Sequence, residues 1–243
     1  MSVMTVTGPV EVETLGITTI HEHLLFDGSW NYTPSDDPAI REMAESPLRM
    51  DTIGYALKFG YAHLDNSHRM DIDEAIEEVT YFKLAGGQTI VDQSPPGLGR
   101  DPKALRKIAQ TTGLNIIMGG GYYEEKRHPE SLKERSVQDI AQELIREITV
   151  GVDDTGVRMG IIGEIGTGDP VTAGEEKVLR ASAIAQASTG IPLSIHHNIW
   201  GLHGPGVLAI AKEEGADLRH TLLSHVDLDA RCDLSYYEEV AST

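Results

Sequence analysis

Ile20-His21-Glu22-His23-Leu24 follows a short apolar run, and one residue separates its two histidines. In a β-strand the side chains of residues i and i+2 lie on the same face, so His21 and His23 would project together. Neutral imidazole is the commonest metal ligand in proteins, and this pair is typical of a site that binds a metal ion through both rings. Taken alone, the motif also fits two surface histidines or two hydrogen-bonded core histidines.

Three further residues of ligand type each stand at the end of an apolar segment, and these are Glu164, His196 and His225. Each of them alone is also compatible with a structural role, such as a glutamate paired with an arginine. Imidazole and carboxylate ligands without a thiolate suit zinc, manganese, cobalt or iron. Five such ligands are more than one catalytic zinc usually takes, and they suit two metal ions that share a carboxylate.

The 243-residue chain alternates short apolar segments with amphipathic ones, and no change in composition divides it, so we expect one domain over residues 1–243. A first strand is expected after residue 16, ending at the His21/His23 pair, and further strands are expected at residues 88–93, 114–118, 159–165, 191–196 and 221–225. Helices are expected at residues 71–85, 101–113, 136–150, 172–190, 206–214 and 234–241. Such alternation is typical of an α/β protein with a parallel sheet and right-handed crossovers.

Two α/β architectures compete. A doubly wound sheet usually has a glycine-rich phosphate loop after its first strand, and here that position holds the His-Glu-His motif. A TIM-type (β/α)8 barrel instead collects functional residues from the ends of many strands. Polar residues follow the expected strands at His21/His23, Gln93, Tyr122/Tyr123, Glu164, His196/His197 and His225. We therefore predict a TIM-type barrel of which about six β/α units are present.

Residues 27–70 interrupt the alternation with a long polar segment that shows no sustained period. Long excursions inside a compact domain are usually functional or partly helical, and we expect this one to be a loop region over the mouth of the site. Trp30, Trp200 and His203 stand in loops that could shape the pocket. His197, next to His196 on a strand, would point the other way, and we assign it no role.

The formal net charge is −18 and the sequence pI is near 4.8, so we exclude nucleic acid and anionic membranes as partners. Cys232 is the only cysteine, so no disulfide framework is possible within the chain. No segment resembles a signal peptide or a membrane span. We expect a cytoplasmic protein.

The motifs together resemble the phosphotriesterase family of the amidohydrolase superfamily, in particular the phosphotriesterase homology proteins. These carry Glu where the better-known organophosphate hydrolases carry a carboxylated Lys. The segments that carry the resemblance are residues 16–24, 121–123, 163–167, 193–196 and 224–227. The resemblance implies a cofactor of two divalent metal ions, with zinc as the default.

By the same resemblance, His21 and His23 bind the buried metal, and Glu164 bridges the two metals. His196 and His225 bind the more exposed metal. Tyr122 or Tyr123 stands where family members place a tyrosine near the substrate, although packing in the barrel explains these tyrosines equally well.

The resemblance implies a hydrolase in which a hydroxide that bridges a binuclear metal centre attacks a small-molecule ester. The substrate could be a lactone, which would make the protein a lactonase, a carboxyl ester or a phosphoester. Family members are often dimers, so a homodimer is possible.

In the family an Asp on the eighth strand takes a proton from the attacking hydroxide. This sequence ends at Thr243, within what should be the sixth helix, so we expect a chain that is truncated or partial at its C-terminus. Asp92 is expected to face away from the site and not to replace that Asp. Asp227 could hydrogen-bond a metal ligand and orient it, or it could cap the next helix. The rival interpretations are a non-catalytic metal- or ligand-binding barrel remnant and a fragment that does not fold alone.

Overall fold

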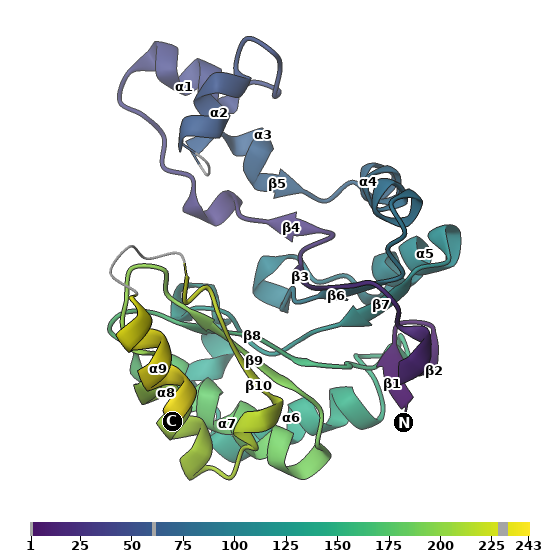
Figure 1. The fold of residues 1–243 in the computed structure, drawn as a ribbon. Helices are drawn as coiled ribbons and strands as arrows, with labels where there is room; N and C mark the ends of the chain where they lie inside the picture. Colours follow the sequence, from purple (N-terminus) through teal and green to yellow (C-terminus); the bar gives the residue numbers. More distant parts are fainter. Residues whose placement is uncertain (1, 60–61, 228–232) are drawn as a thin grey trace.

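The computed structural model describes residues 2–59, 62–227 and 233–243, and its main body is built on two parallel sheets (Figure 1). Each sheet has three strands, and both follow chain order, β3–β6–β7 and β8–β9–β10. The strands are β3 (Thr18–Glu22), β6 (Thr89–Asp92), β7 (Asn115–Met118), β8 (Ile162–Thr167), β9 (Leu193–His197) and β10 (Thr221–Ser224). The expected α/β class with parallel strands is therefore confirmed.

A helix of nine or more residues follows each of these strands, as the sequence pattern predicts, and after β3 it comes beyond the insertion of residues 27–70. The helices are α4 (Ile72–Leu84), α5 (Pro102–Thr112), α6 (Val137–Thr149), α7 (Ala173–Thr189), α8 (Gly204–Glu213) and α9 (Leu234–Ser242). Their ends are set by local chemistry, because Ser136 and Thr172 each begin a helix with a complete capping box. Gly113 and Gly190 end α5 and α7 in the left-handed conformation.

Backbone hydrogen bonds join the two sheets where β7 meets β8. Gly163 N–H donates to the Gly120 carbonyl at 2.7 Å, and Glu164 N–H donates to the Gln93 carbonyl at 2.9 Å. In the described part of the chain, β3 and β10 are the outer strands, and the barrel is not closed. The core lies between the strands and α4–α8, and it includes Ile108, Ile116, Leu144, Val178 and Ile195.

The segment expected to be a loop region is partly helical, so that expectation was wrong in form. It holds α1 (Pro38–Glu45), α2 (Ile53–Phe59) and α3 (Leu64–Ser67), between the paired strands β4 (Phe26–Asp27) and β5 (His68–Arg69). Figure 1 shows these helices on the opposite side of β3 from α6–α9. Helices of four to eight residues are too short to show a sustained period in the sequence.

The N-terminal residues form an antiparallel hairpin of β1 (Ser2–Thr5) and β2 (Gly8–Glu11). The hairpin is attached to the sheet, because Val6 N–H donates to the Ile116 carbonyl at 2.8 Å and the Val6 side chain is buried in the core. Among the described residues, no helix has both the length and the apolar character needed to cross a membrane.

Candidate metal centre

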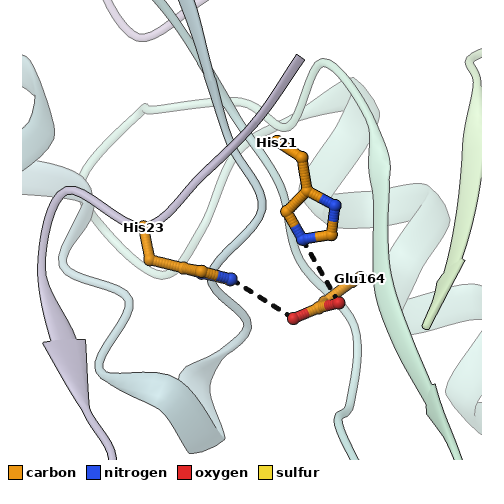
Figure 2. Close-up of side chains that lie close together, drawn as sticks. All are labelled: His21, His23 and Glu164. Carbon is orange, nitrogen blue, oxygen red and sulfur yellow. Dashed lines mark ion pairs between the residues drawn. The ribbon is translucent and has the colours of Figure 1, made fainter. Parts of the chain in front are cut away.

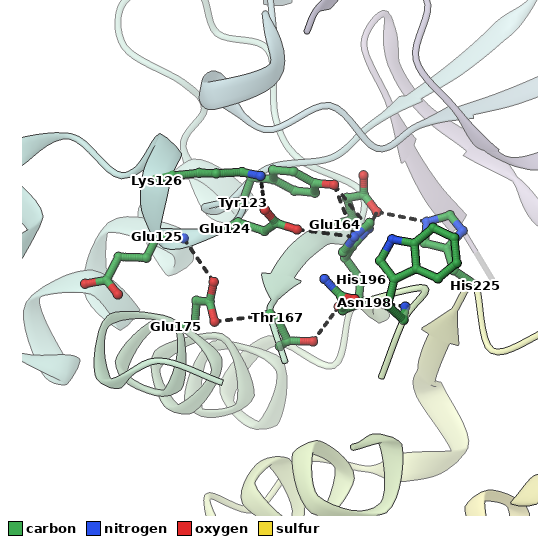
Figure 3. Close-up of polar contacts among 12 residues, drawn as sticks. Tyr123, Glu124, Glu125, Lys126, Glu164, Thr167, Glu175, His196, Asn198 and His225 are labelled. Carbon is green, nitrogen blue, oxygen red and sulfur yellow. Dashed lines mark hydrogen bonds and ion pairs between the residues drawn. The ribbon is translucent and has the colours of Figure 1, made fainter. Parts of the chain in front are cut away.

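Four histidines surround the carboxylate of Glu164, which lies on β8 and is buried. From β3 and the residue just beyond it, His21 Nε2 lies 3.3 Å from Oε2 and His23 Nε2 lies 3.3 Å from Oε1 (Figure 2). From the other sheet, His196 Nδ1 lies 2.8 Å and His225 Nε2 lies 3.4 Å from Oε2 (Figure 3). The structure thus brings together all five residues predicted from the sequence.

The five residues form two groups that share Glu164. His21, His23 and Glu164 make one group, and Glu164, His196 and His225 make the other, each with its ligand-type atoms within 4.8 Å of one another. The ring centroids of His21 and His225 are 4.9 Å apart, so the two groups are adjacent. These are the two sets that the family resemblance implied, and their role as metal ligands stays a prediction.

Bound divalent cations explain the arrangement of the imidazoles around Glu164 better than hydrogen bonds alone. Three imidazole nitrogens approach Oε2 of Glu164, yet a carboxylate oxygen has only two lone pairs. His21 Nε2 is accordingly buried without a hydrogen bond among the described residues. Burial by itself raises the pKa of Glu164, but the four histidines lower that pKa well below its usual value, so the carboxylate stays ionised. An ionised carboxylate with converging imidazoles is a donor set that suits zinc-like metals.

A glycine lets β8 approach β9 closely enough to place Glu164. Gly163 has φ = +139°, which a residue with a side chain rarely adopts, and a Cβ there would lie 2.6 Å from the Ser194 carbonyl oxygen. The run 163–167 therefore combines the carboxylate of the candidate metal centre with a neighbour that must be small.

A residue just after β6 contacts the ring nitrogen of His23 that does not face Glu164. Ser94 Oγ lies 2.9 Å from His23 Nδ1, which leaves Nε2 to face Glu164. Asp92 accepts hydrogen bonds from Leu24 N–H at 2.8 Å and Ser94 N–H at 3.1 Å, so its carboxylate stabilises this turn, and it does not line the cavity beside Glu164. Burial raises the pKa of Asp92. Ser94 was not predicted from the sequence, where its only signal is its position two residues after the end of β6.

The two candidate tyrosines are placed differently. Tyr123 lines the cavity, and its hydroxyl lies 3.1 Å from His196 Nε2. The Tyr122 hydroxyl donates to Glu143 at 2.7 Å and accepts from Arg135 at 3.0 Å, so it is directed toward α6. Of the two tyrosines, Tyr123 is the one that lines the cavity beside Glu164. A role of either tyrosine in substrate binding stays a prediction.

Behind β9 lies a second histidine pair, outside the cluster around Glu164. His197 points away from that cluster, as predicted, and its Nε2 lies 2.8 Å from the Tyr236 hydroxyl of α9. Its ring stacks on His203 with a centroid distance of 4.4 Å. His203 does not line the cavity beside Glu164. Asp227 is exposed and does not cap α9, whose N-cap is Asp233.

The cluster forms one wall of a cavity of about 800 Å³. Trp30 from the insertion and Trp200 from the loop after β9 line it, as the sequence analysis suggested. Lys126 and Glu124 line the same cavity, and the Lys126 ammonium lies 4.2 Å from the centroid of the Trp30 ring. The cavity therefore combines aromatic surface with charged groups beside the candidate metal ligands, which is the usual composition of a small-molecule site.

Comparisons with known proteins point to one family. Residues 1–243 match the model of the phosphotriesterase family. The N-acetyltaurine hydrolase of Xenopus tropicalis is 38% identical over 227 residues, which are 93% of this chain and 64% of that protein. The chain thus spans slightly less than two thirds of the length of the curated relatives that it matches.

Two solved structures resemble the fold. The crystal structure of a resiniferatoxin-binding protein from Rhodobacter sphaeroides matches with a TM-score of 0.92 and 40% identity, over 99% of this chain and 67% of that one. The Escherichia coli phosphotriesterase homology protein, complexed with phosphate in its active site, matches with a TM-score of 0.74 and 26% identity, over 94% and 68% of the two chains.

Proposed function

The chain belongs to the phosphotriesterase family, and we propose that it is a metal-dependent hydrolase of an amide or ester bond in a small molecule. The observation that carries this proposal is the convergence of four imidazoles on the buried carboxylate of Glu164 at the wall of a large cavity. We also propose that the two parallel sheets are part of a TIM-type (β/α)8 barrel, whose functional residues lie at the C-terminal ends of its strands.

His21, His23 and Glu164 would hold one divalent cation, and Glu164, His196 and His225 would hold a second, with zinc as the proposed metal. Such cations supply a lowered pKa for water and polarisation of the scissile carbonyl or phosphoryl oxygen. Other side chains of the protein would orient the metal ligands. Ser94 and Tyr123 orient the imidazoles of His23 and His196, respectively, because each contacts the ring nitrogen that does not face Glu164 most closely.

The cleaved bond could be an ester or an amide. The family resemblance implies an ester, namely a lactone, carboxyl ester or phosphoester. The relatives named N-acetyltaurine hydrolase act on an amide, so we add short N-acyl amides to the proposed substrates. Both bond types present a carbonyl or phosphoryl oxygen that a cation can polarise. A homodimer stays a prediction.

The experiment is to measure metal content and hydrolysis on the same zinc-loaded protein, after dialysis against metal-free buffer. The substrate panel is N-acetyltaurine, a lactone, a carboxyl ester and a phosphotriester. The test variant is His21→Asn, and the matched control is His220→Asn, an exposed histidine that contacts Asp217 far from the cluster. We expect metal content and hydrolysis to fall in His21→Asn and to be unchanged in His220→Asn.

Two results would contradict the proposal. Unchanged metal content in His21→Asn would show that the cluster is not the metal site. Metal binding without hydrolysis of any member of the panel would favour the rival, a protein that binds metal or a small ligand without catalysis. The resemblance to a structure named as a binding protein gives that rival its support.

A further inference from the structure

We propose that Lys126 recognises an anionic group on the substrate, so that the preferred substrates are acyl compounds with a sulfonate or carboxylate a few bonds from the scissile carbonyl. This inference rests on the proposed function and names the substrate class of the same site. It follows from which charged groups in the cavity are accessible, how Lys126 is held, and how near it lies to the cluster around Glu164.

The cavity carries both signs of charge, and Lys126 is its exposed ammonium. Glu164 and Glu124 line the cavity with side chains that are only 3% and 15% exposed, whereas the side chain of Lys126 is 51% exposed. Glu22, the third acidic residue, follows His21 on β3, and its carboxylate accepts a hydrogen bond from Thr19. Glu22 is exposed, but it belongs to β3, whereas Lys126 pairs with Glu124 beside His196. We therefore expect an anionic group of a ligand at the ammonium of Lys126.

Lys126 is held in place and keeps donors available. Its Nζ lies 2.7 Å from Glu124 Oε2 and 4.2 Å from the centroid of the Trp30 ring. An ammonium has three N–H donors, and Glu124 occupies one of them, so others remain for an anionic oxygen. The cation–π contact fixes the ammonium before the ligand arrives, which lowers the entropy lost on binding.

Lys126 also lies at a useful separation from the cluster. Glu124 bridges the two, since its Oε2 contacts Lys126 and its Oε1 lies 3.9 Å from His196 Nε2 (Figure 3). One carboxylate group thus separates the ammonium from a candidate metal ligand. A substrate whose carbonyl reaches the cluster needs only a short linker to place an anion on Lys126.

Arg69, the other cation of the cavity, is less available. One terminal nitrogen of its guanidinium lies 3.0 Å from Glu74 Oε1, and the other donates to Asn66 Oδ1 at 3.2 Å. Both partners belong to the segments on either side of β5, so Arg69 serves mainly to attach the insertion. Lys126 is therefore the residue that we expect to determine specificity.

The test compares two probes of the same shape, N-acetyltaurine and its neutral analogue N-[2-(methylsulfonyl)ethyl]acetamide. We expect Lys126→Met to lower kcat/KM for N-acetyltaurine about 10- to 100-fold, mainly through KM, because a hydrogen bond to a charged group is lost. The rate for the neutral analogue should stay within about twofold of the wild-type rate. Lys126→Arg should recover part of the loss, and Lys133→Met, which removes an exposed ion pair with Glu130, should change neither rate.

Equal losses for both probes in Lys126→Met would show a structural role and overturn the inference. Unchanged discrimination between the probes would also overturn it, because the anion would then be recognised elsewhere. If the wild type hydrolyses neither probe, the amide branch of the proposed function fails, and calorimetric Kd values decide the inference alone. Tighter binding of N-acetyltaurine that is lost in Lys126→Met would support it, and equal Kd values for the two probes would refute it.

Discussion

The inner strands β8 and β9 differ sharply from the outer strands β3 and β10, although all four contribute to one cluster. Every residue of β8 and β9 is buried, whereas no residue of β3 or β10 is fully buried. Glu164 and His196, on the inner strands, make the shortest contact of the cluster at 2.8 Å. His21, His23 and His225 come from the outer strands and lie at 3.3–3.4 Å.

This difference indicates that packing fixes the inner half of the candidate centre, on β8 and β9. A few polar contacts fix the outer half, at β3 and β10. A strand packed on both faces has little freedom, because protein interiors are as dense as organic crystals. An outer strand with exposed residues opens locally at a lower free energy. We therefore expect the shared carboxylate to be preformed and the outer histidines to depend more on their neighbours.

The largest expected effect is that of Glu164→Gln compared with His21→Asn. Because Glu164 belongs to both groups, its loss should remove nearly all bound metal, whereas His21→Asn should leave about half of the wild-type content. Mass spectrometry of dialysed protein gives the metal content, and circular dichroism checks the fold. Equal metal content in the two variants would show that Glu164 is not shared.

The buried ion pair of Arg100 and Glu147 tests whether contacts in the interior contribute more to stability than contacts on the surface. Its nitrogen–oxygen distances are 2.8 and 3.2 Å, and Arg100 packs beneath the end of β7, near the Gly119 carbonyl. Arg100→Met would leave the buried Glu147 unpaired, so we expect the free energy of unfolding to fall by about 3–5 kcal/mol in urea denaturation.

The exposed pair of Lys133 and Glu130 is the control for that experiment. Lys133→Met should leave the denaturation midpoint nearly unchanged, because solvent screens exposed ion pairs. If both variants shifted the midpoint equally, the contrast between interior and surface would be wrong.

Ser94→Ala and Tyr123→Phe compare the two halves directly. Each variant removes the hydroxyl that contacts one ring, His23 or His196. Loss of such a partner typically weakens metal binding about 10- to 100-fold. We expect the larger loss for Ser94→Ala, since His23 lies beyond the end of an outer strand, and chelator competition measures both. A larger loss for Tyr123→Phe would reverse the comparison.

The smallest expected effect concerns Tyr122, at the interface with α6. Burial and the Glu143 carboxylate raise the pKa of Tyr122 to about 12. The folded protein therefore favours the protonated phenol, and this stabilisation is complete below pH 10 and is lost as the pH rises from 10 to 12. Ultraviolet titration of tyrosinate should show one late-titrating group that is missing in Tyr122→Phe. Normal titration of every tyrosine would contradict the assignment.

Much of the fold could be predicted because its signals are local. The strands and helices were located from apolar periods, and Asp101, Ser136 and Thr172 begin helices through contacts within three residues. The set of candidate ligands was also predictable, since parallel strands deliver their carboxyl ends to one edge of a sheet. The short helices α1–α3 were not predictable from a period, because each is too short to show one.

The sequence by itself therefore determined the order of elements and the identity of the five residues around Glu164. Only the tertiary structure decided which nitrogen of each histidine faces Glu164, which tyrosine enters the cavity, and that Ser94 and Lys126 belong to the site. The physical reason is separation along the chain. Ser94 is 71 residues from His23, and Tyr123 is 73 residues from His196, so no local pattern records these contacts. They exist because packing places the ends of different strands within hydrogen-bonding distance.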